Sequence, residues 1–328
     1  MTEKKAFSKD IIKLADVEKS ALKITENLKN DVYKVLRRQG GVVGISGGID
    51  SAVTLALAAQ ALGANNVLGI LMPDRDSSPD SKKLALELAD KFGIQTIEED
   101  MTAALYGFGC YVRRDEAVKS VIADFNPEED KFKIEIKQQV INMKLPPMFY
   151  VTVYFRNGKI ESKRLPLKAY LQIVAASNFK QRSRMAMLYY HAEANHFAVI
   201  GTPNKHEVQQ GFFVKYGDGG ADVMPIGQLF KTQVYQLAHY FGVPKAIINR
   251  IPTTDTYSAE QTQEDFFYQL PFEDMDPLWY AWENDYPAIE VATVMGYSED
   301  EIVSIFTNFE RKVKTTEYLR MSPIHYIE

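Results

Sequence analysis

Cysteine is almost absent from this sequence, which has only Cys110 among its 328 residues. A lone thiol excludes an intrachain disulfide framework, a cysteine-based zinc cluster and a CxxC redox centre, and it favours a reducing compartment. Long apolar runs are also absent, because no stretch approaches the roughly 18 residues that span a bilayer. The first residues lack the apolar segment of a signal peptide. We therefore expect a cytoplasmic protein with no membrane partner, and Cys110 as a half-buried thiol.

A strong charge excess of either sign is missing as well. The chain has 38 Lys and Arg against 43 Asp and Glu, a formal net charge of −5, which argues against non-specific nucleic-acid binding. The hydrophobic content of 46% and the aromatic content of 12% are those of a globular protein with a large core.

Short apolar segments alternate with helical patterns along the first third of the chain and again near residue 200. This alternation predicts right-handed crossovers and a parallel sheet covered by helices on both faces, so the fold class is α/β, doubly wound. We expect one domain over residues 1–328. The predicted strands are 42–45, 67–71, 94–97 and 197–200, and the predicted helices are 11–35, 50–62, 81–92, 168–176, 179–195, 227–241, 244–250 and 287–318.

The periodicity changes between residues 124 and 167, where apolar and polar residues alternate. Asn157-Gly158 suits a type I′ turn, so this segment predicts an inserted β-hairpin. The segment 201–222 is rich in glycine and too long for an idle connection, and we expect it to close over a substrate. His206 within it is expected to be a loop residue without a catalytic role.

A buried strand runs directly into Ser46-Gly47-Gly48 and then into a helix that begins with Asp50 and Ser51. Residues without a Cβ allow the backbone N–H groups to form a concave anion site, and the helix adds the positive end of its dipole. A carboxylate beside a phosphate site indicates Mg²⁺. The sequence has neither the Walker motif nor GxGxxG, which excludes P-loop NTPases and nicotinamide dehydrogenases.

Residues 46–51 resemble the PP-loop of the ATP pyrophosphatases, which cleave ATP to AMP and pyrophosphate. Five further segments resemble NAD synthetase in order and spacing. They are NFKQRSRM (178–185), GTPNKHE (201–207), FFVKYGDGGAD (212–222), PIGQLFKT (225–232) and PTTD (252–255). The resemblance implies an adenine nucleotide alpha hydrolase-like fold and the ATP-dependent amidation of deamido-NAD to NAD, through an adenylated nicotinate carboxylate that ammonia attacks.

The resemblance also implies roles for individual residues. It implies catalytic roles for Asp50 and Lys231 and an Mg²⁺ site made by Asp50 and Glu207. The implied ATP contacts are Ser46, Gly47, Gly48, Asp50, Ser51, Thr202, Lys231 and Thr253, and the implied deamido-NAD contacts are Arg182, Arg184, Lys215, Asp222, Arg311 and Lys312. The family's homodimer and its use of free ammonia are implied too, and a separate glutaminase subunit stays open.

Some positions differ from the family pattern. Pro203 replaces an aspartate, residues 261–264 differ from an acidic motif, and residues 124–167 are an extra segment. Two alternatives therefore remain: a related PP-loop ligase that adenylates another carboxylate, or a nucleotide-binding protein without activity. Without a binding function, the twin glycines would form only a tight turn, with Asp50 as a favourable first-turn charge. Arg182 and Arg184 would then lie on a solvated helix face.

Overall fold

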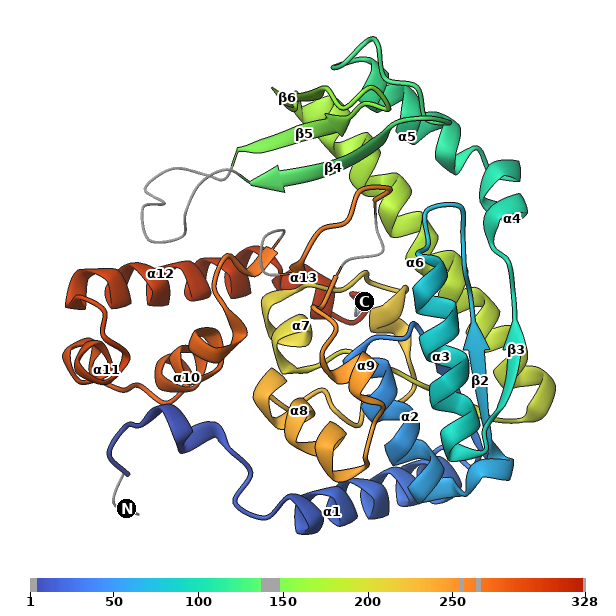
Figure 1. Ribbon diagram of the computed structural model, residues 1–328. Helices are drawn as coiled ribbons and strands as arrows, with labels where there is room; N and C mark the ends of the chain where they lie inside the picture. The colour runs from blue at the N-terminus through green and yellow to red at the C-terminus, as the bar shows by residue number, and fades with distance from the viewer. Residues whose placement is uncertain (1–4, 137–147, 254–256, 264–266, 327–328) are drawn as a thin grey trace.

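A four-stranded parallel sheet forms the centre of the protein (Figure 1). The computed structural model describes residues 5–136, 148–253, 257–263 and 267–326. The strands lie in the order β3-β2-β1-β7. The predicted strands are confirmed to within one residue at each end, with bounds β1 Gly41–Gly44, β2 Val67–Leu71, β3 Gln95–Glu98 and β7 Ala198–Ile200.

Helices cover both faces of this sheet, as the alternation of strands and helices predicts. Consecutive residues of β1 divide between the faces: Val42 packs in a cluster with α6, and Val43 packs in the cluster that contains α1, α2 and α8. Side chains of a strand point alternately to opposite faces, so two buried neighbours require two covered faces. The α/β, doubly wound class is confirmed. These helices are α1 Val17–Asn30, α2 Ile49–Leu62, α6 Leu167–Asn195 and α8 Lys231–Tyr240.

Several predicted helices have different limits in the structure, and the one expected over residues 227–241 begins only at Lys231. The helix expected over residues 11–35 begins only at Val17, because Asp16 caps it by accepting a hydrogen bond from the Lys19 N–H. The segments 168–176 and 179–195 form one helix, α6. The helix expected over residues 287–318 is divided, because Gly296 adopts a left-handed conformation and Ser298 caps a new helix. Its parts are α11 Ala288–Met295, α12 Glu299–Thr315 and α13 Glu317–Arg320.

The predicted hairpin is present, and a third strand joins it to make an antiparallel sheet in the order β4-β5-β6. The type I′ turn is wrong, because only Gly158 has a positive φ, of 84°, whereas type I′ needs two such residues. The Gly158 N–H donates to the Phe155 carbonyl and the Phe155 N–H to the Lys159 carbonyl, so the loop has three residues. Residues 137–147 of the insertion lie outside the described residues. The strands are β4 Lys131–Ile136, β5 Phe149–Tyr154 and β6 Ile160–Arg164.

The remaining elements complete the fold, and α10 Phe272–Glu283 packs with α11 and α12 in an apolar cluster apart from the two sheets (Figure 1). The glycine-rich segment contains a helix and a short 3₁₀ turn where a loop is expected, α7 Lys205–Gln210 and η5 Asp218–Gly220. Within the described ranges, every helix is too short or too polar to span a membrane. The other elements are η1 Lys9–Ile12, η2 Asp31–Val35, η3 Ala64–Asn66, α3 Pro79–Phe92, α4 Thr102–Gly107, α5 Cys110–Lys119, α9 Lys245–Ile248 and α10 Phe272–Glu283.

Candidate active site

The turn between β1 and α2 has the backbone shape that the twin glycines predict. Gly47 has a φ of +72°, and a Cβ on it would lie 2.5 Å from the Ser81 carbonyl oxygen. Ser46 Oγ accepts from the Gly48 N–H at 3.3 Å, and Ser51 Oγ donates to the Gly48 carbonyl at 2.9 Å. The turn is therefore held in shape before any ligand binds, and only its first glycine is sterically obligatory.

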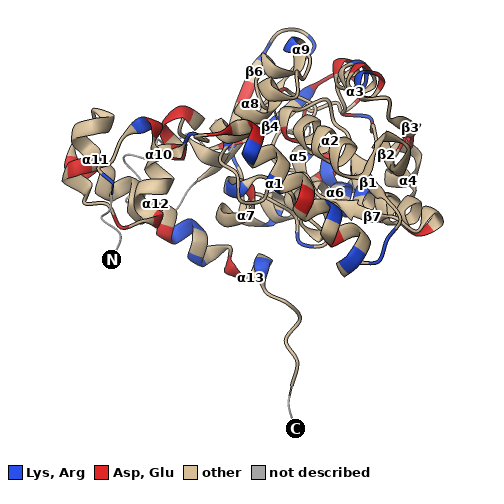
Figure 2. Ribbon diagram, turned by 90° about the horizontal axis from the view of Figure 1, so that it is seen from below, with Lys and Arg blue, Asp and Glu red and all other residues tan. Residues whose placement is uncertain are grey.

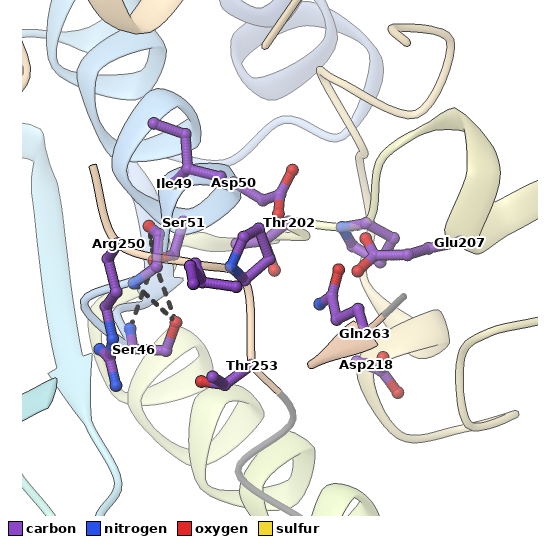
Figure 3. Close-up of a pocket in the computed structure, with 14 residues that line it drawn as sticks. Ser46, Ile49, Asp50, Ser51, Thr202, Glu207, Asp218, Arg250, Thr253 and Gln263 are labelled. Atoms are coloured by element: carbon purple, nitrogen blue, oxygen red, sulfur yellow. Dashed lines mark hydrogen bonds between the residues drawn. The ribbon is translucent and has the colours of Figure 1, made fainter. Parts of the chain in front are cut away.

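A pocket opens above this turn, at the carboxyl ends of the strands (Figure 3). In Figure 3 Ser46, Ser51 and Arg250 lie on one side of it, Glu207, Gln263 and Asp218 lie on the other, and Asp50 and Thr202 lie between them. Ligands of doubly wound proteins bind at this edge of the sheet. The lining residues are Ser46, Gly48, Ile49, Asp50, Ser51, Thr202, Pro203, Glu207, Asp218, Arg250, Ile251, Pro252, Thr253 and Gln263.

Asp50 and Lys231 form an ion pair, with 2.5 Å between Oδ2 and Nζ. The Lys231 side chain is fully buried; burial alone would lower its pKa, but the charges of Asp50 and Glu207 outweigh this effect and raise it. Asn204 Nδ2 donates to the other oxygen, Asp50 Oδ1, at 3.2 Å. The lysine is thus a permanent positive charge beside the pocket, as a residue that stabilises a phosphate leaving group must be.

Glu207 lies on the opposite side of the pocket, in the first turn of α7. Asn204 caps this helix: its side chain accepts from the Glu207 N–H at 3.1 Å, and Glu207 Oε2 accepts from the Asn204 N–H at 2.9 Å. Burial, and then the nearby Asp50 charge, raise the pKa of Glu207 to about 8. A divalent cation between two such carboxylates would relieve their repulsion, so Asp50 and Glu207 fit the predicted metal pair.

Two carboxylates are fewer than a protein-only metal cage requires. Across the described ranges, no group of three or more His, Cys, Asp or Glu residues could hold a metal ion. Mg²⁺ in nucleotide sites is commonly held by one or two carboxylates together with substrate phosphates and water. The donor set fits a cation that arrives with its nucleotide.

The residues expected to contact deamido-NAD lie outside the pocket wall. Arg182 is exposed, and its Nε donates to the Lys215 carbonyl at 3.1 Å. Arg184 is half-buried and donates to Asp74 Oδ2 at 2.9 Å, so it is not a solvated surface residue. Lys215 Nζ donates to the carbonyls of Tyr318 and Met321 at 3.0 and 2.7 Å.

Asp222 and Lys312 lie apart from each other. Asp222 is exposed and accepts from the Tyr189 hydroxyl at 3.0 Å and from the Val199 N–H at 2.8 Å. Lys312, which follows Arg311 on α12, donates to the Phe267 carbonyl at 2.9 Å and lies 4.6 Å from the Phe267 ring centre. Burial, and then the Arg311 charge, lower the pKa of Lys312 to about 7. Most of the expected ATP residues therefore line one pocket, whereas the expected substrate residues lie outside its wall.

Sequence reasoning missed four residues near the pocket. Arg250 and Gln263 line it, and Asn204 contacts Asp50. Asp218 also lines it, and burial raises its pKa to about 6 despite a 2.8 Å hydrogen bond from the Val214 N–H. Asp218 belongs to the GDGG motif, and Arg250 stands two residues before Pro252 of the PTTD motif, so their places in the sequence could have marked both as candidates.

His206 and Cys110 are both buried. His206 is a buried residue of α7, not a loop residue, and its Nε2 lies 2.6 Å from Asp276 Oδ1. Cys110 is more deeply buried than expected, with 4% of its surface exposed, and burial raises the pKa of its thiol, so it is no nucleophile. Thr254 and Asp255 of the PTTD motif, and Glu264, lie outside the described residues.

Comparison with known proteins identifies the family. The sequence profile of the NAD synthase family matches residues 20–126 and 133–323. The chain is 44% identical over 306 residues to the NH3-dependent NAD(+) synthetase of Mesorhizobium japonicum, covering 93% of this chain and 95% of that protein. It is 41% identical to the enzyme of the same name from Rhizobium meliloti, covering 97% and 94%.

Solved structures agree on the fold. An NH3-dependent NAD synthetase from Campylobacter jejuni superposes with a TM-score of 0.63 at 21% identity, covering 96% of this chain and all of that one. An NMN synthetase from Francisella tularensis has the same TM-score at 22% identity, covering 95% and 98%. At such identities the likeness establishes the fold alone, whereas the sequence matches establish the kinship. The chain belongs to the NAD synthase family.

Proposed function

We propose that this protein catalyses the ATP-dependent amidation of deamido-NAD to NAD with ammonia as the nitrogen donor. The observation that carries the proposal is the pocket at the PP-loop, where Asp50, Lys231 and Glu207 meet in a chain 44% identical to an NH3-dependent NAD(+) synthetase. The relative is matched over 95% of its length, so the kinship extends over the whole enzyme.

The chain's own groups suit a triphosphate. Gly48, Ile49 and Asp50 at the N-terminal end of α2 line the pocket, and Arg250 adds a cation on the same side as Ser46. Thr202 and Thr253 line the wall between, where their hydroxyls can donate to phosphate or ribose oxygens. These groups account for ATP as the co-substrate.

Asp50 and Glu207 would hold Mg²⁺, which when bound neutralises phosphate charge and increases the electrophilicity of the α-phosphorus. The raised pKa of Glu207 supports this assignment, since a bound cation would favour its charged form. Lys231, held by Asp50, lies where it can balance charge that develops on the departing pyrophosphate.

The reaction has two steps. A carboxylate oxygen of the nicotinate ring attacks the α-phosphorus of ATP, the bond to the bridging oxygen of the β-phosphate breaks, and pyrophosphate leaves. Ammonia then attacks the acyl carbon, AMP leaves with its oxygen, and the nitrogen loses a proton. Asp218, an acid of the pocket with a pKa of about 6, is largely ionised at neutral pH and is suited to accept that proton.

We further propose a cytoplasmic homodimer whose subunits both contribute to the dinucleotide site. Arg182 and Lys215 contact each other, but neither they nor Lys312 line the pocket, which supports a site that one subunit leaves incomplete. Residues 321–326, after α13, extend away from the body (Figure 2), and Ile324 and Tyr326 are 69% and 92% exposed. Exposed apolar side chains on an extended tail are suited to an interface. Sedimentation at micromolar concentration should give twice the mass of the chain.

The test of the activity uses purified protein with ATP, Mg²⁺, ammonium and deamido-NAD. We expect NAD, AMP and pyrophosphate in equal amounts, and an Asp50→Ala variant without measurable turnover. Formation of ADP in place of AMP would overturn the proposal, because it requires cleavage between the β- and γ-phosphates.

Two changes of substrate in the same assay distinguish the remaining alternatives for the acceptor and the nitrogen donor. Nicotinate mononucleotide carries the same carboxylate on a smaller molecule, and its use in place of deamido-NAD would indicate the related ligase that adenylates another acid. Glutamine replaces ammonium in a second arm. We expect no NAD with glutamine alone, and NAD formation with glutamine after addition of cell extract would indicate a separate glutaminase.

A further inference from the structure

One buried carboxylate joins the two helices that carry Lys231 and Glu207. Asp276 of α10 accepts a hydrogen bond from the Thr232 N–H at 2.6 Å through Oδ2, and its Oδ1 lies 2.6 Å from His206 Nε2. Thr232 follows Lys231 in the first turn of α8, and His206 precedes Glu207 in the first turn of α7. Each partner of Asp276 is thus the chain neighbour of a charged residue at the pocket.

The hydrogen bonds of His206 determine its tautomer. Gln210 Nε2 lies 3.2 Å from His206 Nδ1 and donates to Met275 Sδ, a thioether that can only accept, at 3.4 Å, while Gln210 Oε1 lies 3.4 Å from Lys312 Nζ. The amide therefore presents its oxygen to Lys312 and its nitrogen to the imidazole. His206 accepts at Nδ1 and carries its hydrogen on Nε2, which donates to Asp276.

The surroundings prevent any other partner from replacing this pair. The side chains of His206 and Asp276 are both 0% exposed. The imidazole packs against the rings of Phe230, Tyr268 and Trp279, with centroid distances of 5.5 to 6.1 Å. A buried carboxylate that lost one donor could not be resolvated by water, so the two helices would have to shift to satisfy it.

We propose that His206 and Asp276 are positioning residues for the reaction, and that the chain from Gln210 through His206 and Asp276 to the Thr232 N–H fixes Glu207 relative to Lys231. The inference rests on the proposed function, because it assigns these residues to the pocket that binds ATP. Neither residue lines the pocket, so both act through their neighbours. Displacement of a catalytic group by about 1 Å can lower a rate a hundredfold.

The test compares three variants with wild-type protein. His206→Met keeps the volume and removes the donor to Asp276, whereas His206→Gln keeps an N–H that can reach Asp276. His191→Met is the matched control, because His191 of α6 also pairs with a carboxylate, Glu99, at 2.8 Å, but does not line the pocket.

We expect kcat of His206→Met to fall by about tenfold to a hundredfold, with KM for deamido-NAD within about twofold of wild type. His206→Gln should recover most of kcat, and His191→Met should retain it. Unchanged kcat in His206→Met at a temperature where it is folded would overturn the inference, as would an equal loss in His191→Met. If wild-type protein itself forms no NAD, the proposed function fails first.

A second measurement serves if His206→Met does not fold. The ¹⁵N shifts of the imidazole in wild-type protein report which ring nitrogen carries the hydrogen. We expect a protonated Nε2 and an unprotonated Nδ1, and the opposite tautomer would contradict the proposed chain. Asp276→Asn, which leaves one amide group to serve two donors, should lower kcat as His206→Met does.

Discussion

At the scale of single residues, the two glycines of the turn between β1 and α2 differ in whether they could be replaced by a residue with a Cβ. Gly47 has a positive φ and no room for a Cβ. Gly48 has a φ of −93°, and a Cβ added to it would lie 3.3 Å from Ser46 Oγ, its nearest neighbour. The sequence motif treats them alike, but the backbone conformation separates them.

We expect Gly47→Ala to lower the free energy of unfolding by at least about 1–2 kcal/mol, the cost of a left-handed conformation for a residue with a Cβ, plus the clash with Ser81. Gly48→Ala is the matched control and should cost less than about 1 kcal/mol. Urea unfolding of both variants measures the difference. Equal destabilisation would show that Gly47 does not have this left-handed conformation in solution.

Glu207 gives the unliganded protein a predictable pH dependence. Its pKa rises from 4.5 when unfolded to about 8 when folded, so between these values the folded protein holds a proton that the unfolded chain has lost. Stability from this group is therefore greatest at low pH and falls as the pH rises towards 8. Asp218, with a pKa raised to about 6, acts in the same direction over a lower range.

We expect Glu207→Gln to flatten this fall, so that the variant without metal or nucleotide is more stable than wild type at about pH 8. Its NAD formation should nevertheless be lost, since an amide is a poor ligand for Mg²⁺. Denaturant titrations at several pH values provide the measurement. Parallel pH profiles for the two proteins would contradict the raised pKa of Glu207.

At the scale of elements, helix starts carry the charged residues of the pocket. Asp50, Glu207 and Lys231 all stand in the first turn of a helix, α2, α7 and α8. Asn204 both caps α7 and donates to Asp50, so local structure and pocket geometry depend on one side chain. Ser298 forms the same kind of capping box at α12 and lines no part of the pocket.

Asn204→Ala and Ser298→Ala form a matched pair. Each should lower stability by about 1 kcal/mol, typical for the loss of an N-cap, with Asn204 at the upper end because it is buried. Only Asn204→Ala should also lower kcat/KM for ATP, because it frees Asp50 Oδ1. Steady-state kinetics of the two variants test this difference, and a similar kinetic loss in Ser298→Ala would refute the link between cap and pocket.

At the scale of the whole molecule, the antiparallel sheet β4-β5-β6, our predicted insertion, contacts the segment that precedes Gln263 of the pocket wall. Residues 258–261 run beside β4: the Ala259 N–H donates to the Phe132 carbonyl at 3.0 Å and Gln261 Nε2 to the Ile134 carbonyl at 2.7 Å. Phe132 is fully buried between Phe125 and Tyr257. We propose that the insertion supports the segment of Thr253 and unfolds with the rest of the chain as one domain.

Phe132→Ala should therefore lower the free energy of unfolding by about 3–5 kcal/mol within a single transition and raise KM for ATP. Ile160→Ala, at a side chain 62% exposed on the same sheet, should change neither. Unfolding followed by circular dichroism and by fluorescence gives the transitions. Two separate transitions in wild-type protein would mark the insertion as an independent unit.

The sequence alone determined the features that rest on local physics. Apolar periodicity located the strands of the parallel sheet, and the run of Ser46, Gly47 and Gly48 between a strand and a helix located the turn at the pocket. The sequence did not reveal the break at Gly296 within residues 287–318, and the predicted division of α6 near Ser177 and Asn178 falls inside one continuous helix.

Only the tertiary structure decided which distant residues share an environment. Asp50 and Lys231 are far apart in the chain, yet their side chains pair at 2.5 Å because the sheet brings the start of α2 beside the start of α8. The contact between His206 and Asp276, and the raised pKa of Glu207, depend on burial among residues from several helices. Periodicity and turn chemistry act over a few residues, whereas burial and electrostatic coupling depend on the packing of the complete chain.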